Sequence, residues 1–210
     1  MLSAARDDSA CRAILSGADL LLPDGVGAIL LSGGRIRRRI PGIEMGEALL
    51  ALSASYGSRV FLLGSKKGVA ECAAERLSRR FVGLRVVGTH HGYFGDDALP
   101  HVTELLRASE AELLIVCMGF PKQEKLLLDL SDSLPTLRVG IGLGGALDVW
   151  AGVSRRAPLP FRLLGLEWLY RILKEPSRVP RLFGSVRRLL RKKDGEKKGR
   201  SALYGAPPDL

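Results

Sequence analysis

The fold is decided by residues 112–124, which read ELLIVCMGFPKQE. Six consecutive apolar residues, 113–118, lie between a glutamate and a Gly-Phe-Pro turn, and such a run predicts a strand covered on both faces. Pro121 suits the first turn of a helix, and the pattern that follows predicts a helix over Lys122–Leu130. A buried strand that turns directly into a helix is typical of a parallel sheet with helices packed on it.

Outward from this unit, apolar runs alternate with helical patterns along most of the chain. Strands are expected at Ala18–Leu22, Arg59–Leu63, Leu84–Gly88, Glu112–Met118 and Leu137–Ile141, and helices at Glu44–Tyr56, Val69–Phe81, Leu99–Ala108 and Lys122–Leu130. We therefore predict a Rossmann-like α/β fold, in which a mostly parallel sheet carries helices on both faces.

The charge of the chain is concentrated at one end. The 210 residues carry a formal net charge of +10, and residues 151–210 hold all of that excess. Together with the positions of prolines and glycines, this charge distribution divides the whole chain into three parts. We expect an α/β catalytic domain over 1–158, a basic amphipathic helical appendage over 159–192, and a disordered tail over 193–210. Such an appendage suits phosphates, whether of nucleic acid, anionic lipid or a nucleotide, although a solvated basic face is the plainer alternative.

Several protein classes are excluded by the sequence. No uncharged apolar run reaches the ~18–20 residues of a membrane-spanning helix, and the N-terminus lacks the apolar region of a secretory signal. The three cysteines (Cys11, Cys72 and Cys117) are widely spaced, which fits a reducing cytoplasm. His90 and His91 are adjacent on an expected strand end and should point to opposite faces, so we expect no metal site and no cofactor.

Three groups of residues are expected where strands end, at the edge where open α/β sheets bind ligands. Asp24 follows the first apolar run and is either a general base or a Pro-Asp-Gly turn residue, the turn being favoured by spacing alone. Lys122 and Gln123 begin a helix and either face the ligand or cap that helix. Gly142, Gly144 and Gly145 form a glycine-rich turn without the acidic residue of a dinucleotide fold.

Arginines in the basic region form a fourth group. Arg171, Arg178 and Arg181 flank two prolines, and Arg178 and Arg181 are spaced to face one way. Guanidinium groups bind phosphates bidentately, so these side chains either hold a diphosphate or belong to a solvated helix face.

The whole chain resembles the WecG/TagA/CpsF glycosyltransferase family, glycosyltransferase family 26. The resemblance rests on strings in the family's order across roughly residues 10–182: ADLLLPDGVG, IPGIEMGEALL, RVFLLGSKKGVAE, VVGTHHGYF, LLIVCMGFPKQEK, VGIGLGGALDVWAG and RAPLPFRLLGLEWLYRILKEPSRVPRL. It implies an inverting transfer of an N-acetylmannosamine-type hexose from a UDP-sugar. Since the sequence has no obvious D-x-D motif and arginines can stabilise the leaving diphosphate, we expect the transfer to need no metal. The implied acceptor is a sugar on a polyprenyl diphosphate at the cytoplasmic face of the membrane, in cell-envelope polysaccharide synthesis.

The resemblance also implies roles for individual residues. Asp24 matches the family's proposed base, Gln123 its acceptor-pocket glutamine, and Arg39 the pocket arginine just upstream of IPGIE. By spacing, Arg171, Arg178 and Arg181 match the C-terminal arginines that close over the UDP diphosphate. The implied partners are the donor, the lipid-linked acceptor, an anionic membrane surface and a possible homo-oligomer, with nucleic acid unexpected. The implied location is cytoplasmic, peripheral on the inner face of the membrane.

The chain departs from the family pattern in three places. Family members have a first strand that ends in a T-x-N-like string lining the active site, and Met1 of this sequence falls after the matching position. The linker between Asp24 and Gly42 is a few residues shorter than in the family. Glu44 stands where the family has an aspartate. The alternative function is therefore a catalytically degenerate member that binds lipid or nucleic acid through its basic segment.

Overall fold

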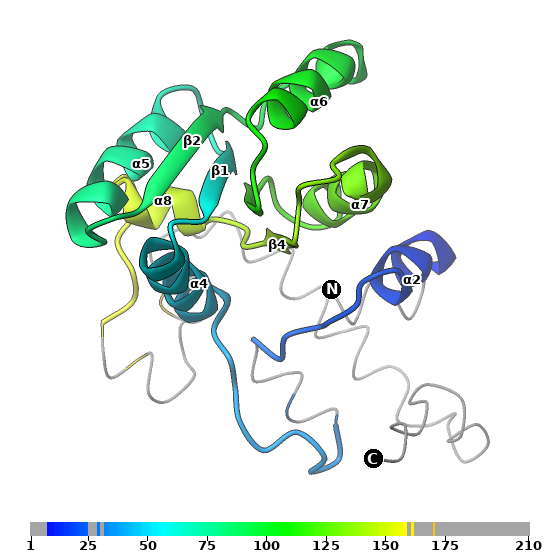
Figure 1. Ribbon diagram of the computed structural model, residues 1–210. Coiled ribbons are helices and arrows are strands. Elements are labelled where there is room, and N and C mark those ends of the chain that lie inside the picture. Colours follow the sequence, from blue (N-terminus) through cyan, green and yellow to red (C-terminus); the bar gives the residue numbers. More distant parts are fainter. Residues whose placement is uncertain (1–7, 25–28, 30–31, 159–160, 162–169, 171–210) are drawn as a thin grey trace. The chain divides into compact units, whose positions relative to one another are not determined.

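The computed structural model describes residues 8–24, 29, 32–158, 161 and 170 (Figure 1). The chain divides into two units, residues 1–165 and 166–210, and the second unit contributes only Tyr170 to the described residues. The expected tail, and all of the expected appendage except positions 161 and 170, therefore lie outside the described residues.

The first unit is built on a four-stranded, all-parallel sheet. Its strands are β1 (Arg59–Gly64), β2 (Arg85–His90), β3 (Leu113–Cys117) and β4 (Val139–Gly142), in the order β2-β1-β3-β4. The central strands β1 and β3 pair from Val60 and Leu113 to Gly64 and Cys117, and apart from Arg59 at the start of β1 both are apolar, as strands covered on two faces require. The expected α/β fold with a parallel sheet is confirmed.

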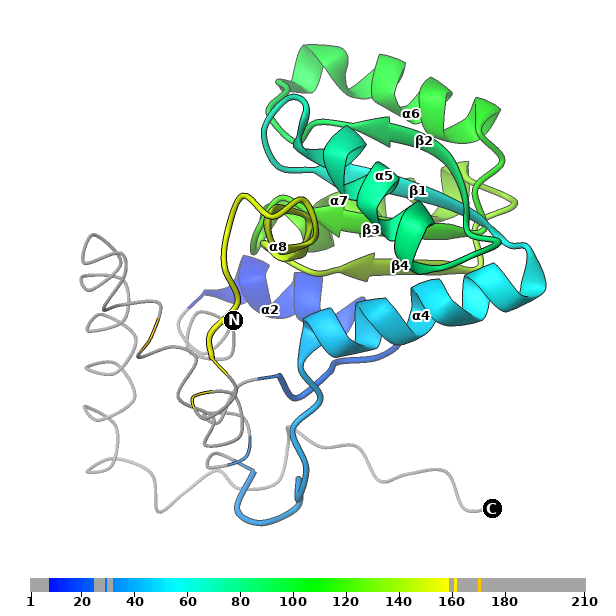
Figure 2. The ribbon, with the colours of Figure 1, turned by 90° about the vertical axis from the view of Figure 1, so that its left-hand side faces the viewer.

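Helices cover both faces of this sheet. The helical elements in the described residues are α2 (Ser9–Ser16), α4 (Gly42–Tyr56), α5 (Val69–Arg80), η1 (Asp96–Ala98), α6 (Leu99–Ala108), α7 (Lys122–Leu130), η2 (Ser131–Ser133) and α8 (Ala146–Trp150). Two views agree that α5 and α8 lie on one face and α6 and α7 on the other (Figure 1, Figure 2). Helix α4 belongs to the α5–α8 side, because Leu50 packs in the same core.

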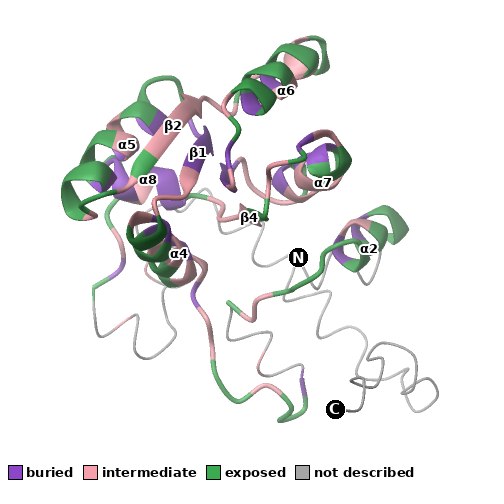
Figure 3. Ribbon diagram, in the orientation of Figure 1, coloured by how far each residue is buried: buried purple, intermediate pink, exposed green. Residues whose placement is uncertain are grey.

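The two faces form two separate cores because neighbouring residues of a strand point in opposite directions. In β1, Val60 and Leu62 pack with α5 and α8, whereas Phe61 and Leu63 pack with α6 and α7. The same alternation runs through β3, and the buried residues concentrate along the sheet and the inward sides of the helices (Figure 3).

The predicted strand at Ala18–Leu22 is wrong. This segment is irregular, and Leu20 and Leu21 remain 74% and 51% exposed. An apolar run becomes a strand only when a neighbouring strand accepts its hydrogen bonds, and within the described residues the sheet ends at β4. The short helix α2 was not predicted, although Asp8 caps it by accepting hydrogen bonds from the Ala10 and Cys11 backbone nitrogens.

Candidate functional site

The loops that follow the four strands interlock at one edge of the sheet. The Ser65 backbone nitrogen donates to the Cys117 carbonyl, and Gly92 donates to the Ser65 carbonyl. Leu143, just beyond β4, donates to the Val116 carbonyl. This is the carboxyl-terminal edge, where open α/β sheets bind their ligands.

The glycines of β4 make room for one face of α7. A Cβ added to Gly142 would lie 2.6 Å from Gln123 Nε2, and one added to Gly140 would lie 2.7 Å from Leu127 Cδ2. Positions 140 and 142 share one side of the strand, and positions 123 and 127 share one face of the helix. The glycine spacing therefore matches the spacing of the side chains that press against it, and close packing accounts for both glycines.

Gln123 joins two of the interlocking loops. The side chain is only 4% exposed, and its Oε1 accepts hydrogen bonds from the Gly119 nitrogen (3.1 Å) and the Gly144 nitrogen (3.0 Å). Its Nε2 donates to Glu124 Oε1 at 2.8 Å. The helix cap considered for this side chain is not formed, because α7 has no side-chain cap. The amide instead ties the loop after β3 to the loop after β4.

Asp24 lies at the start of α4, beside the glycine-rich turn. The Ile40 nitrogen donates to the Pro23 carbonyl at 3.0 Å, which holds the two segments together. A Cβ placed on Gly42 would lie 3.8 Å from Asp24 Oδ2 and 3.4 Å from the side chain of Leu143. The Asp24 side chain is exposed at this point, as a residue that receives a substrate proton must be.

The remaining predicted site residues are placed as follows. Arg39 is half-buried and directly precedes Ile40, so it enters the same neighbourhood as Asp24. Lys122 is exposed at the first position of α7, and Gly145 is exposed just before α8. The arginines Arg171, Arg178 and Arg181 lie outside the described residues. The structure therefore brings Asp24, Arg39, Gln123 and the glycine-rich turn to one edge, and their roles remain predictions.

A serine–aspartate pair at this edge was missed by the sequence analysis. Ser65 Oγ donates to Asp148 Oδ1 at 2.6 Å, and the two residues are 83 positions apart. Ser65 is buried and adopts a left-handed backbone with φ 58°. No local motif marks such a pair, because it forms only when the loop after β1 meets α8.

Two charged groups on the α4 side are structural. Glu44 accepts a hydrogen bond from Arg156 at 2.6 Å, so the glutamate at this position supports an ion pair in the fold. Glu47 accepts two hydrogen bonds from Arg80 and one from the Trp150 indole. The Arg80 guanidinium, above all, holds the pKa of the Glu47 carboxyl below its ordinary value.

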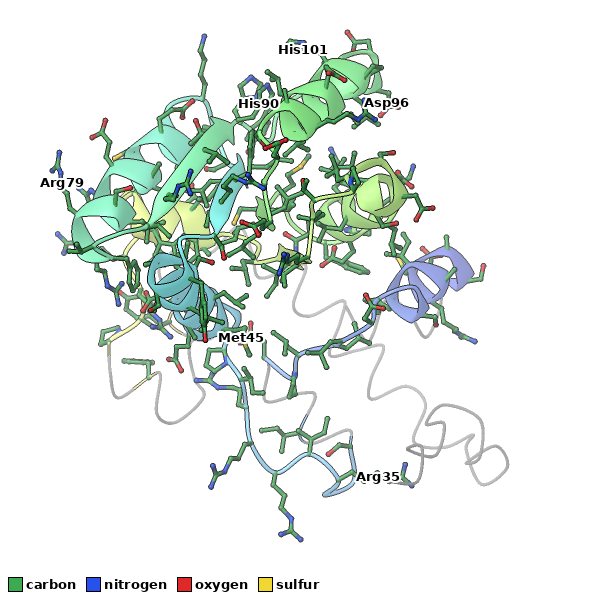
Figure 4. The ribbon with its side chains drawn as sticks, viewed as in Figure 1. Arg35, Met45, Arg79, His90, Asp96 and His101 are labelled. Carbon is green, nitrogen blue, oxygen red and sulfur yellow. The ribbon has the colours of Figure 1, made fainter. Side chains whose placement is uncertain are left out.

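The histidine pair differs from its expected arrangement. The rings of His90 and His91 stack with their centroids 4.5 Å apart, because β2 ends at His90 and the strand alternation ends with it. Figure 4 shows His90 at the end of β2 near α6, the helix that carries His101. Within the described ranges, no group of three or more His, Cys, Asp or Glu residues is placed to hold a metal ion.

The edge with Asp24 is distinct from a surface hollow of about 390 Å³ at the other end of the strands. That hollow lies between α4 and the starts of β3 and β4, and its lining includes Leu52, Tyr56 and Val139. Among the described residues that line it, one is acidic and one is basic, Glu112 and Arg138, and these two form an ion pair. It is therefore a poor candidate for acid–base chemistry.

Comparison with known proteins identifies the family of this chain. A family model described as "Glycosyl transferase WecG/TagA/CpsF family" matches residues 1–199. A relative from Bacillus spizizenii (strain ATCC 23059 / NRRL B-14472 / W23) is 36% identical over 173 residues, which are 81% of this chain and 66% of the relative. A relative from Bacillus subtilis (strain 168) is 31% identical over 197 residues, 92% of this chain and 75% of the relative. Both are named N-acetylglucosaminyldiphosphoundecaprenol N-acetyl-beta-D-mannosaminyltransferase. The chain thus spans about two thirds to three quarters of the length of these relatives.

Proposed function

Because the chain belongs to the WecG/TagA/CpsF glycosyltransferase family, as its motifs predicted, we propose that it transfers an N-acetylmannosamine-type hexose from a UDP-sugar to a sugar on a polyprenyl diphosphate. The observation that carries this proposal is the position of Asp24, exposed beside the glycine-rich turn at the carboxyl edge of the sheet. The names of the relatives, which specify a diphosphoundecaprenol-linked acceptor and a mannosaminyl transfer, support the choice of substrates.

In the proposed reaction, Asp24 is the general base. Its carboxylate takes the proton of the acceptor hydroxyl while that oxygen forms a bond to the anomeric carbon. The bond from the anomeric carbon to the UDP oxygen breaks on the opposite face, so the configuration inverts and UDP leaves with the bonding electrons. Asp24 suits this role because its side chain is exposed and lies near Gly42 and Leu143, at the carboxyl edge of the sheet.

The leaving diphosphate needs positive charge, because negative charge develops on it as the bond breaks. Lys122 is exposed at the start of α7. Arg39 directly precedes Ile40, whose backbone nitrogen donates to the carbonyl of Pro23, the residue before Asp24. We assign the diphosphate to Arg171, Arg178 and Arg181, which match the family's C-terminal arginines by spacing, and leave Lys122 and Arg39 to the sugars. Gln123 is buried and its amide is bonded to Gly119, Gly144 and Glu124, so it shapes the acceptor pocket by holding the loops around it.

The proposed location is the cytoplasmic face of the cell membrane, as a peripheral protein. Two observations support it: the acceptor named for the relatives is a lipid, and residues 151–210 hold the entire net charge of +10. In the described part of the chain, no helix has the length and apolar character needed to cross a membrane. A basic amphipathic segment would hold the enzyme on anionic lipid near its acceptor.

The test of this function measures UDP affinity and UDP release in parallel. Wild type, Asp24→Asn and the control Asp19→Asn are compared, Asp19 being an exposed aspartate of the same segment. We expect Asp24→Asn to lower acceptor-dependent UDP release by at least about 10²-fold, the lower range for a general base, while UDP affinity stays within about twofold. Asp19→Asn should match wild type in both measurements.

Two outcomes would contradict the proposal. Unchanged turnover in Asp24→Asn would remove this residue from the role of base. The second outcome is that wild type releases no UDP in an acceptor-dependent way from any UDP-sugar and binds vesicles or nucleic acid tightly. That result would favour the alternative function, a catalytically degenerate family member that binds lipid or nucleic acid.

A further inference from the structure

The amide of Gln123 can adopt only one orientation in this fold. Two backbone nitrogens, of Gly119 and Gly144, approach one end of the amide, and both can only donate. The oxygen must therefore occupy that end, and the nitrogen must occupy the other. At that second end the acceptor is Glu124 Oε1, at 2.8 Å. Donors and acceptors agree at all three contacts, so the network itself assigns oxygen and nitrogen.

In the described part of the chain, the Glu124 carboxylate has one polar contact, which is with Gln123. Within the residues that the structure describes, its Oε1 accepts from Gln123 Nε2, and its Oε2 is buried without a hydrogen-bond partner. No ion pair explains a carboxylate at this position in the described residues. A carboxylate in the first turn of a helix is favoured by the helix dipole, but that effect does not require the side chain to fold back onto its neighbour.

We propose that Glu124 is a positioning residue for the transfer site. Its carboxylate orients the Gln123 amide, and the oriented amide holds the loop after β3 and the loop after β4 in one arrangement. Gly142 packs against the same amide, so the glutamine is held from two sides. This inference rests on the proposed function, because the two loops border the edge where Asp24 lies.

The alternative is that Glu124 contacts a ligand directly through its charge. The two roles predict different results for Glu124→Gln. A positioning role needs only an acceptor oxygen facing Nε2, and glutamine supplies one. A charged contact to a ligand would be lost in Glu124→Gln as completely as in Glu124→Ala.

The experiment uses four variants and a control in the full chain: Glu124→Gln, Glu124→Ala, Gln123→Glu, the exchanged pair Gln123→Glu with Glu124→Gln, and Asp129→Asn. Asp129 is an exposed carboxylate of the same helix, so its variant controls for the loss of charge. Each protein is measured for kcat, for KM of both substrates from pH 5 to 8, and for amide hydrogen exchange at residues 117–123 and 142–145.

The expected pattern has three parts. Glu124→Gln stays within about threefold of wild type in kcat, whereas Glu124→Ala loses about tenfold or more and exchanges faster in both loops, as expected when a buried hydrogen-bond network opens. Gln123→Glu sets two carboxylates at hydrogen-bond distance, so its kcat falls at pH 8 and recovers toward pH 5 as one of them protonates. The exchanged pair restores a donor facing an acceptor and recovers wild-type exchange and pH dependence.

Three results would overturn the proposal. One is wild-type loop exchange in Glu124→Ala, and another is an exchanged pair no better than Gln123→Glu. The third is a Glu124→Gln variant as impaired as Glu124→Ala in kcat with normal loop exchange, which would assign Glu124 to a ligand. If wild type transfers no sugar, the exchange measurements still decide the positioning role, and the missing activity counts against the proposed function alone.

Discussion

Replacing Gly142 by alanine tests how tightly α7 is packed against β4. The new Cβ would lie 2.6 Å from Gln123 Nε2, whereas ordinary contacts begin at 3.4 Å, so the side chain must retreat by about 0.8 Å. Its hydrogen bonds to Gly119 and Gly144 already measure 3.1 and 3.0 Å, and a retreat of that size would break or strongly lengthen them. Strain and partly unpaired donors together should lower the free energy of unfolding by about 2–4 kcal/mol.

Chemical denaturation and thermal melting measure this loss. A destabilisation of that size corresponds to a melting point lowered by about 5–15 °C for a chain of this length. The matched control is Gly145→Ala, three residues away in the same turn. Gly145 has an ordinary φ of −93°, and its new Cβ would meet only Asp148 Oδ2 at 3.7 Å. We expect this control to change the free energy of unfolding by less than about 1 kcal/mol.

The result that would refute the packing argument is a Gly142→Ala protein as stable as Gly145→Ala. In that case the glycines of β4 would not be needed for the contact with Gln123, and another reason for their spacing would be required.

Three further predictions concern other parts of the molecule. Glu47→Gln should lower the free energy of unfolding by about 1 kcal/mol near pH 7, measured by denaturation. Since Arg80 depresses the pKa of Glu47, this difference between variant and wild type should shrink as the pH falls below the ordinary glutamate range. A difference that stays constant down to pH 3 would contradict this prediction. Burial raises the pKa of Cys117 to about 12, so iodoacetamide at pH 8 should label the half-buried Cys72 well before Cys117. Mass spectrometry of the labelled peptides measures the two rates, and equal rates would contradict the burial of the Cys117 thiol. Deleting residues 159–210 removes most of the basic excess and should abolish co-sedimentation with anionic vesicles at low salt, whereas undiminished binding would place the membrane contact elsewhere.

The central strands and the longer helices could be predicted because their signals are local. Strand β3 is a continuous apolar run, and α6 and α7 begin and end at the expected residues. The segment Ala18–Leu22 was also expected to be a strand, since three leucines follow Asp19, and yet it forms none. The difference is the neighbour, because a strand needs a partner with free hydrogen-bonding groups, and a run of leucines does not specify one.

The sequence indicated which residues gather at this edge but not how they contact one another, and their roles stay predictions. Gln123 follows a strand as expected, whereas Asp24 follows an irregular segment and reaches the edge through the contact of Pro23 with Ile40. What the glycines do was not predictable, since G-x-G-x-G gives no indication of which helix will press against the strand. The Ser65–Asp148 pair was equally invisible, because its partners are far apart in the chain and meet only at the assembled edge.

The measurement that tests the central claim most directly is mass spectrometry of the lipid product. The full chain is incubated with UDP-N-acetylmannosamine and a polyprenyl-diphosphate-linked N-acetylglucosamine, beside Asp24→Asn. The account predicts a lipid product enlarged by one N-acetylhexosamine residue in wild type and none in the variant. An unaltered acceptor in wild type with every UDP-sugar offered, or an enlarged product at the same rate in Asp24→Asn, would contradict it.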